Sequence, residues 1–90
     1  MESKIVNRAL LLVKQARLVD LEAAGKSNYK RWQNIRAEQA QIRADEIEIL
    51  GSVFPSYRWW LMTGEVMPEV GQTSPEYDEA NARLKQQSEG

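Results

Sequence analysis

The sequence predicts an all-α protein, a small helical bundle, and three observations support this fold class. Apolar residues recur every three or four positions through much of the chain, which is the period of an amphipathic helix. Helix start and stop signals follow one another in order along the chain. No segment alternates apolar and polar residues in the way that a half-buried strand does.

The composition bounds the chemistry of the chain. Its 90 residues suffice for one domain with a modest core. The absence of cysteine and histidine removes disulfides and the usual zinc ligands. No calcium-type ligand loop or Gly-rich phosphate loop occurs, and a helix start explains the acids Asp45, Glu46 and Glu48. We therefore expect no cofactor, no metal and no enzymatic activity.

The longest apolar run, Ala9 to Val13, is too short to span a bilayer, and the N-terminus lacks the pattern of a signal peptide. We therefore expect a cytoplasmic protein with no membrane partner.

Residues 3–24 are predicted to form one long N-terminal helix because they contain no Gly or Pro. Ser3 is the expected N-cap and Gly25 the expected left-handed residue after the helix. A break near Arg17–Leu18, followed by a separate short helix from Val19 to Ala24, is the alternative. One apolar row consists of Ile5, Ala9, Leu12, Ala16, Val19 and Ala23, and a second of Val6, Leu10 and Val13. This wide stripe indicates self-association.

Three shorter helices are predicted next. The first is capped by Ser27 or Asn28, continues to about Arg36 and buries Tyr29, Trp32 and Ile35. The second begins after an N-cap at Arg43 and stops before Pro55, and the third is capped by Ser56 and ended by Gly64. Trp59, Trp60 and Leu61 are consecutive, so they cannot share one helix face, and Trp59 is a candidate for an interface.

The C-terminal part is predicted as an extended linker followed by an appended helix. Ser74-Pro75-Glu76 is a strong helix start, and the helix should continue to about Gln87. Its apolar content is thin, so it must dock on something or fray. The predicted organisation is a helical domain over residues 1–65, a linker over 66–73 and a C-terminal helix and tail over 74–90.

The net charge of −1 conceals a strong segregation along the chain. Residues 26–43 have a net charge of +4, whereas residues 65–90 have a net charge of −4. Such segregation matters more than the total charge for an anionic partner. The basic residues can neutralise phosphates, and the neighbouring Asn and Gln side chains can match the donor and acceptor pair of adenine. The alternative is a solvated helix face. The acidic tail is too dilute in charge to mimic DNA.

Three motifs carry a family resemblance: Tyr29-x-x-Trp32-x-x-Ile35, Phe54-Pro55-x-Tyr57 and Trp60-Leu61-x-Thr63-Gly64-Glu65. Together they resemble the lambda-repressor-like (XRE-type) helix-turn-helix family, and more narrowly small phage and bacterial DNA-binding proteins that end in a WLxTGE segment. The resemblance implies a helical bundle that binds paired half-sites of double-stranded DNA as a homodimer. It places the recognition helix at residues 27–36. The predicted DNA contacts, from the basic cluster and its polar neighbours, are Lys26, Ser27, Asn28, Lys30, Arg31, Gln33, Asn34, Arg36 and Arg43. The predicted interface residues, from the apolar stripe and the consecutive aromatic residues, are Leu10, Val13 and Trp59.

Two functions are consistent with these observations. The first is a phage-type transcriptional regulator that occupies an operator, with the recognition helix in the major groove. The second is a protein-interaction module, a host-targeting inhibitor or adaptor that has lost DNA binding. The long N-terminal helix leaves little room for a scaffold helix between Leu18 and Ser27, which favours the second. Exposure of Lys30, Arg31 and Asn34 on one face would favour the first.

Overall fold

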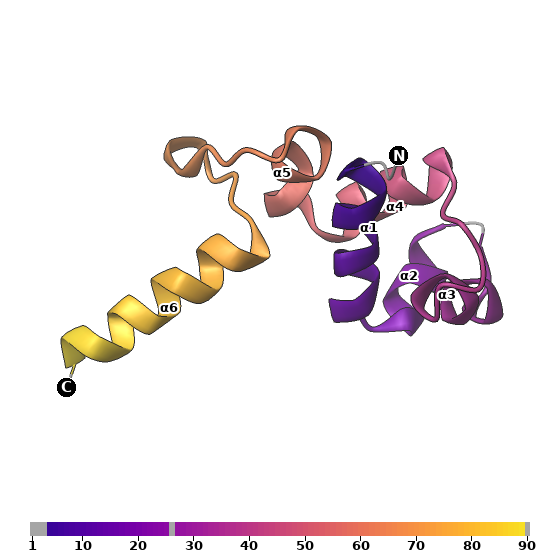
Figure 1. The fold of residues 1–90 in the computed structure, drawn as a ribbon, viewed down its shortest axis with the longest axis horizontal. Helices are drawn as coiled ribbons and strands as arrows, with labels where there is room; N and C mark the ends of the chain where they lie inside the picture. The colour runs from indigo at the N-terminus through magenta and orange to yellow at the C-terminus, as the bar shows by residue number, and fades with distance from the viewer. Residues whose placement is uncertain (1–3, 26, 90) are drawn as a thin grey trace.

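The computed structural model describes residues 4–25 and 27–89. Five helices pack together: α1 (Lys4–Gln15), α2 (Leu18–Ala24), α3 (Tyr29–Arg36), α4 (Ala44–Val53) and α5 (Arg58–Thr63), the last two joined by the 3-10 turn η1 (Pro55–Tyr57). After the 3-10 turn η2 (Pro68–Val70), α6 (Pro75–Glu89) extends away from this bundle (Figure 1). The described residues contain no strand, and the predicted all-α fold is confirmed.

The predicted single N-terminal helix is wrong, and the alternative is confirmed: the chain breaks near Arg17–Leu18, and a separate short helix, α2, follows. Arg17 is extended, with φ −80° and ψ 122°, and α2 starts at the next residue. The break turns Leu18 and Leu21 into the core, whereas Val19, which belonged to the predicted stripe, is 49% exposed. Burial of these two leucines therefore outweighs the helix propensity of the segment. The predicted N-cap Ser3 lies outside the described residues.

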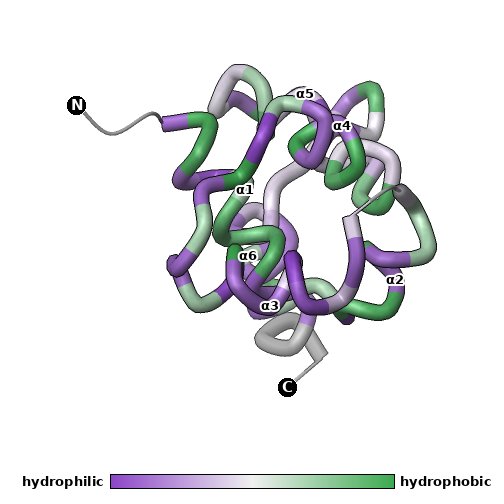
Figure 2. Tube along the Cα trace, turned by 90° about the vertical axis from the view of Figure 1, so that its right-hand side faces the viewer, coloured by the Kyte–Doolittle hydropathy of each residue, from purple (hydrophilic) through white to green (hydrophobic). Residues whose placement is uncertain are grey.

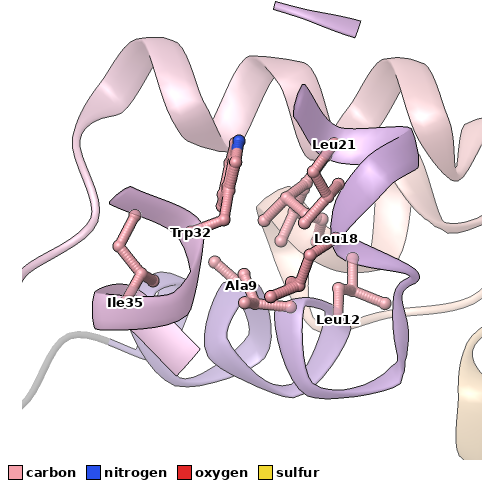
Figure 3. Packing of buried hydrophobic residues seen from close by; sticks show 9 residues of the cluster. Ala9, Leu12, Leu18, Leu21, Trp32 and Ile35 are labelled. Atoms are coloured by element: carbon pink, nitrogen blue, oxygen red, sulfur yellow. The ribbon is translucent and has the colours of Figure 1, made fainter. Parts of the chain in front are cut away.

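The core lies where α1, α2 and α3 meet, with α4 and α5 closing it from the other side. Hydropathy alternates along α1, as expected of a helix with one buried face (Figure 2). Figure 3 shows side chains from these three helices gathered together, namely Ala9, Leu12, Leu18, Leu21, Trp32 and Ile35. Trp32 and Ile35 are buried, which confirms their predicted place in the core, whereas Tyr29, which was also predicted to be buried, is 37% exposed.

Local capping fixes the starts of α3 and α4. The side chain of Asn28 accepts a hydrogen bond from the backbone N–H of Arg31 at 2.8 Å, so the predicted cap of α3 is confirmed. Arg43 is the N-cap of α4 as predicted, and its backbone N–H donates to Glu46 Oε1 at 2.9 Å. Ser56 does not cap the following helix, because it lies inside the η1 turn.

Gly64 and Gly25 are required for different reasons, the first for its backbone conformation and the second for its lack of a side chain. Gly64 ends α5 as predicted, and it does so in the left-handed conformation, with φ +80°. Gly25 is extended, with φ −158°, so the predicted left-handed conformation is wrong there. Its missing side chain still matters, since a Cβ would lie 2.2 Å from Ile49 Cδ1 on α4. The turn after α2 can therefore pass close to α4.

The connection between α5 and α6 is folded back on itself rather than extended. Met67 and Gln72 form an antiparallel bridge around η2, and Gly71 takes φ +80° to close the loop. The side chain of Gln72 fastens this loop to the bundle. It accepts from the backbone N–H of Trp59 at 2.9 Å and donates to the carbonyl oxygen of Pro55 at 3.0 Å. The expected linker therefore has a fixed shape.

Arg8 ties the first helix to the last one of the bundle. Its guanidinium donates to the carbonyl oxygens of Leu61 at 3.0 Å and Met62 at 3.3 Å, near the C-terminal end of α5. Carbonyls in the last turn of a helix lack partners within the helix, and a cation there is favourable. No helix within the described ranges is long and apolar enough to cross a membrane.

Replacing Leu12 by Ala tests the inward face of α1. Leu12 is fully buried, so Leu12→Ala should lower the free energy of unfolding by about 2–5 kcal/mol through lost burial and the cavity left behind. Leu11→Ala is the matched control, because Leu11 is 44% exposed and should change stability by no more than about 0.5 kcal/mol. Urea unfolding followed by tryptophan fluorescence measures both, and equal losses would contradict this orientation of α1.

Candidate nucleic-acid interface

Helices α2 and α3 form a two-helix unit with a short connection. α2 ends at Ala24 and α3 begins at Tyr29, so residues 25–28 join them, and the two helices pack against each other. This is the arrangement in which a first helix supports a second one that contacts DNA. The stretch between Leu18 and Ser27, which was expected to leave barely room for a scaffold helix, holds the seven-residue helix α2.

A carboxylate on α2 holds the start of α3. Glu22 Oε2 accepts a hydrogen bond from the backbone N–H of Tyr29 at 2.8 Å. The first N–H groups of a helix have no partner within the helix, and a negative charge is favourable at that end. Sequence reasoning missed this contact, because nothing in the spacing of the two residues shows that the turn brings them together.

The faces of α3 differ sharply in character. Trp32 and Ile35 are buried, and at about 100° per residue Lys30, Gln33 and Asn34 lie on the opposite side of the helix. Lys30 is exposed, and Gln33 and Asn34 are half-buried. No other described residue forms a hydrogen bond or an ion pair with these three side chains. Their polar groups are therefore available to a ligand.

A fully buried carboxylate, Glu46, fixes the position of α3. Its Oε2 accepts from Ser27 Oγ at 2.6 Å and from Arg31 Nε at 2.9 Å. Its Oε1 accepts from Arg31 Nη2 and from the backbone N–H of Arg43, both at 2.9 Å. Arg31 Nη2 also donates to the carbonyl oxygen of Gln41 at 2.7 Å. The network joins the turn, α3, the following loop and α4.

This environment determines the charge state of Glu46. Burial alone would raise the pKa of its carboxyl, but hydrogen bonds from Arg31, Ser27 and the backbone of Arg43 lower that pKa to about 2. The same hydrogen bond from Arg31 raises the pKa of its guanidinium. Both groups are therefore charged at neutral pH, and the negative charge of Glu46 compensates the positive charge of Arg31.

Some of the predicted DNA-contacting side chains are engaged within the protein, and others are exposed. Ser27 is buried and its hydroxyl is bound to Glu46, so that side chain has no free surface for DNA. Arg31 is committed to Glu46 and positions α3. Asn28 caps α3, and Arg36 is exposed in the last turn of that helix. The distance between Arg43 Nε and Asp45 Oδ1 is 3.7 Å. Lys26 lies outside the described residues.

The three predicted interface residues differ in how far they are exposed. Val13 is fully buried in the core, so it has no surface to offer a second chain, and its proposed interface role is wrong for that reason. Leu10 is half-buried against the core. Trp59 is 42% exposed, and its interface role stays a prediction. Among the residues that the structure describes, no group of three or more carboxylates could hold a metal ion.

Comparison with known proteins finds a similar phage protein among the solved structures. No protein-family model matches the chain, and no curated protein matches it. The chain is similar to Pf6r from the filamentous phage Pf6 of Pseudomonas aeruginosa PA01, with a TM-score of 0.83 and 41% sequence identity. The similarity covers 92% of this chain and 99% of that one. This relative agrees with the predicted phage character of the protein.

The pH dependence of stability tests the Glu46 network. The pKa of Glu46 falls from an ordinary 4.5 to about 2 on folding, so its contribution is present above 4.5 and is lost as the pH falls toward 2. The contribution is roughly 3 kcal/mol. Glu46→Gln should be less stable than wild type at neutral pH, because Arg31 loses its partner, and should lose less further stability on acidification.

Urea unfolding at a series of pH values measures this difference. Glu48→Gln is the matched control, since Glu48 is an exposed carboxylate on the same helix. It should follow the wild-type pH profile. A Glu46→Gln profile parallel to that of the wild type would show that the carboxylate does not carry the acid sensitivity.

Proposed function

We propose that this chain, which belongs to the same family as the phage protein Pf6r, is a DNA-binding transcriptional regulator of phage type. One observation carries the proposal. The outer face of α3 presents Lys30, Gln33 and Asn34 with no partner among the described residues, in a helix-turn-helix unit whose inner face is fixed. Helix α6 leaves the bundle on the far side from α2 and α3, so it does not cover this face (Figure 1).

In the proposed mode of binding, α3 enters the major groove of double-stranded DNA. Lys30 neutralises a phosphate or contacts guanine, and the amides of Gln33 and Asn34 match the donor and acceptor pair of adenine. Arg36 and Arg43, which are exposed, add phosphate contacts at the edges. Two protomers bind paired half-sites, and repression or activation follows from occupying the operator.

The Glu46 network gives α3 the rigidity that base reading needs. Four hydrogen bonds on one carboxylate hold the turn, α3 and α4 together. A side chain reads a base edge only when its backbone is held in place, because a misplaced donor or acceptor loses its bond. Arg31 therefore supports recognition through position rather than through contact with DNA.

A protein-interaction module that has lost DNA binding is the second candidate. The neutralisation of Arg31 by Glu46 favours it, because it removes one positive charge from the predicted basic surface. Against it stands the open outer face of α3. The same experiment separates the two candidates.

Fluorescence anisotropy with a labelled DNA duplex tests DNA binding. The wild type should bind a random duplex at low salt, and the affinity should fall steeply as salt rises. Lys30→Ala should weaken binding and reduce the slope of log K against log salt by about 0.9, the value for one phosphate contact. A separate variant, Glu46→Gln, tests whether the Glu46 network positions α3 for binding.

Lys4→Ala is the matched control, since it removes the same charge at the end of α1 that lies away from α3 (Figure 1). It should bind like the wild type. Absence of binding at low salt and tens of micromolar protein, where nonspecific affinity is measurable, would overturn the DNA-binding proposal and favour a protein partner.

A further inference from the structure

Helix α6 carries an apolar stripe that the described part of the chain covers only in part. Tyr77, Ala80 and Leu84 are spaced at i, i+3 and i+7, which places them on one face of the helix. Tyr77 is 37% exposed and Leu84 is 63% exposed. Figure 1 shows α6 extending from the bundle into open space.

The bundle holds α6 at its beginning. Ser74 Oγ accepts a hydrogen bond from the backbone N–H of Tyr77 at 3.0 Å. Tyr57 in η1 donates its hydroxyl to Asp78 Oδ2 at 2.7 Å. A 15-residue helix with few apolar residues is marginal in water unless one face packs against something. The later turns of α6 therefore need a partner.

The order of charges along α6 indicates which partner fits. The acids Glu76, Asp78 and Glu79 lie in the first half of the helix, whereas the second half holds the bases Arg83 and Lys85 and one acid, Glu89, at its end. Within one helix, Arg83 also forms an ion pair with Glu79. A parallel pair of such helices places acids beside acids. An antiparallel pair places the acidic half of each helix beside the basic half of the other, which is favourable.

We propose that α6 packs antiparallel against α6 of a second copy of this chain. A two-fold axis near Ala80 and Asn81 places Tyr77 opposite Leu84 of the second copy, and the small Ala80 allows the helices to approach closely. Glu76 and Arg83 lie on one flank of the stripe, at about 100° per residue, whereas Glu79, the partner of Arg83 within the same helix, lies farther toward the back. In an antiparallel pair equal flanks meet, so Arg83 also lies beside Glu76 of the other helix. The interface is self-complementary, as two-fold symmetry requires.

This inference rests on the proposed function, in which two protomers bind DNA together, and it names α6 as the segment that joins them. It places dimer formation on α6, at the far end of the molecule from α3 (Figure 1). The α3 faces of both copies stay open to DNA. Because assembly does not involve α3, it can be measured without DNA and judged separately from DNA binding.

Sedimentation equilibrium of the full chain at tens of micromolar tests the assembly. The wild type should have twice the 10.3 kDa mass of one chain. Leu84→Glu should shift the mass to that of a monomer. Ala82→Glu is the matched control, because Ala82 lies on the opposite side of α6 from the stripe, and it should remain a dimer. Circular dichroism should show that the bundle stays folded in both variants.

Cysteine crosslinking tests the orientation, since the chain contains no cysteine of its own. A mixture of Tyr77→Cys and Leu84→Cys should form disulfides between the two variants on mild oxidation. Each variant alone should form several-fold fewer, and Ala82→Cys alone should form none. Disulfides mainly within each variant would mean a parallel pair and would overturn the inference.

Two further outcomes would also overturn it. One is a wild-type monomer, and the other is a dimer that survives Leu84→Glu but is lost in Trp59→Glu, which would move the interface to α5. If the wild type is monomeric yet binds DNA with the expected salt dependence, the α6 pairing fails and the DNA-binding proposal stands.

Discussion

The ion pair between Glu46 and Arg31 is the interaction on which the arrangement of α2, α3 and α4 depends. A fully buried carboxylate is unfavourable unless it is paired and hydrogen-bonded, and Glu46 has four donors from three separate segments. Removal of one partner leaves a buried charge uncompensated. The pair thus contributes to stability above pH 4.5 and also constrains the orientation of α3.

This constraint also explains how the basic segment is used. Of the cations predicted to contact DNA, Arg31 faces inward to Glu46, whereas Lys30 faces outward. The packing of Trp32 and Ile35 on the core determines which side of α3 is free. Two neighbouring cations that look alike in the sequence therefore differ: Arg31 holds α3 in position, whereas Lys30 lies on its free surface.

Much of the fold was predictable from the sequence, since Asn28, Arg43, Pro55 and Gly64 mark helix ends where the structure has them. The break at Arg17 was not predictable with certainty, because no Gly or Pro marks it. It arises from the burial of Leu18 and Leu21, which depends on contacts distant in sequence.

The site was predictable in part for the same kind of reason. The spacing of Trp32 and Ile35 identifies the inner face of α3, and hence its outer face. The role of Glu46 could be seen only as an acid at a helix start, because the sequence does not show that Ser27 and Arg31 converge on it. Side-chain networks between segments depend on tertiary packing, which local patterns do not encode.

The most direct measurement of the central claim is a nuclear magnetic resonance titration of isotope-labelled protein with a DNA duplex. The side-chain amides of Gln33 and Asn34 and the backbone of Lys30 report on the outer face of α3. We predict that their signals shift first and most, while those of α6 change little. Shifts centred on another surface, or no shifts at all, would contradict the account that α3 is held in place to present its outer face to DNA.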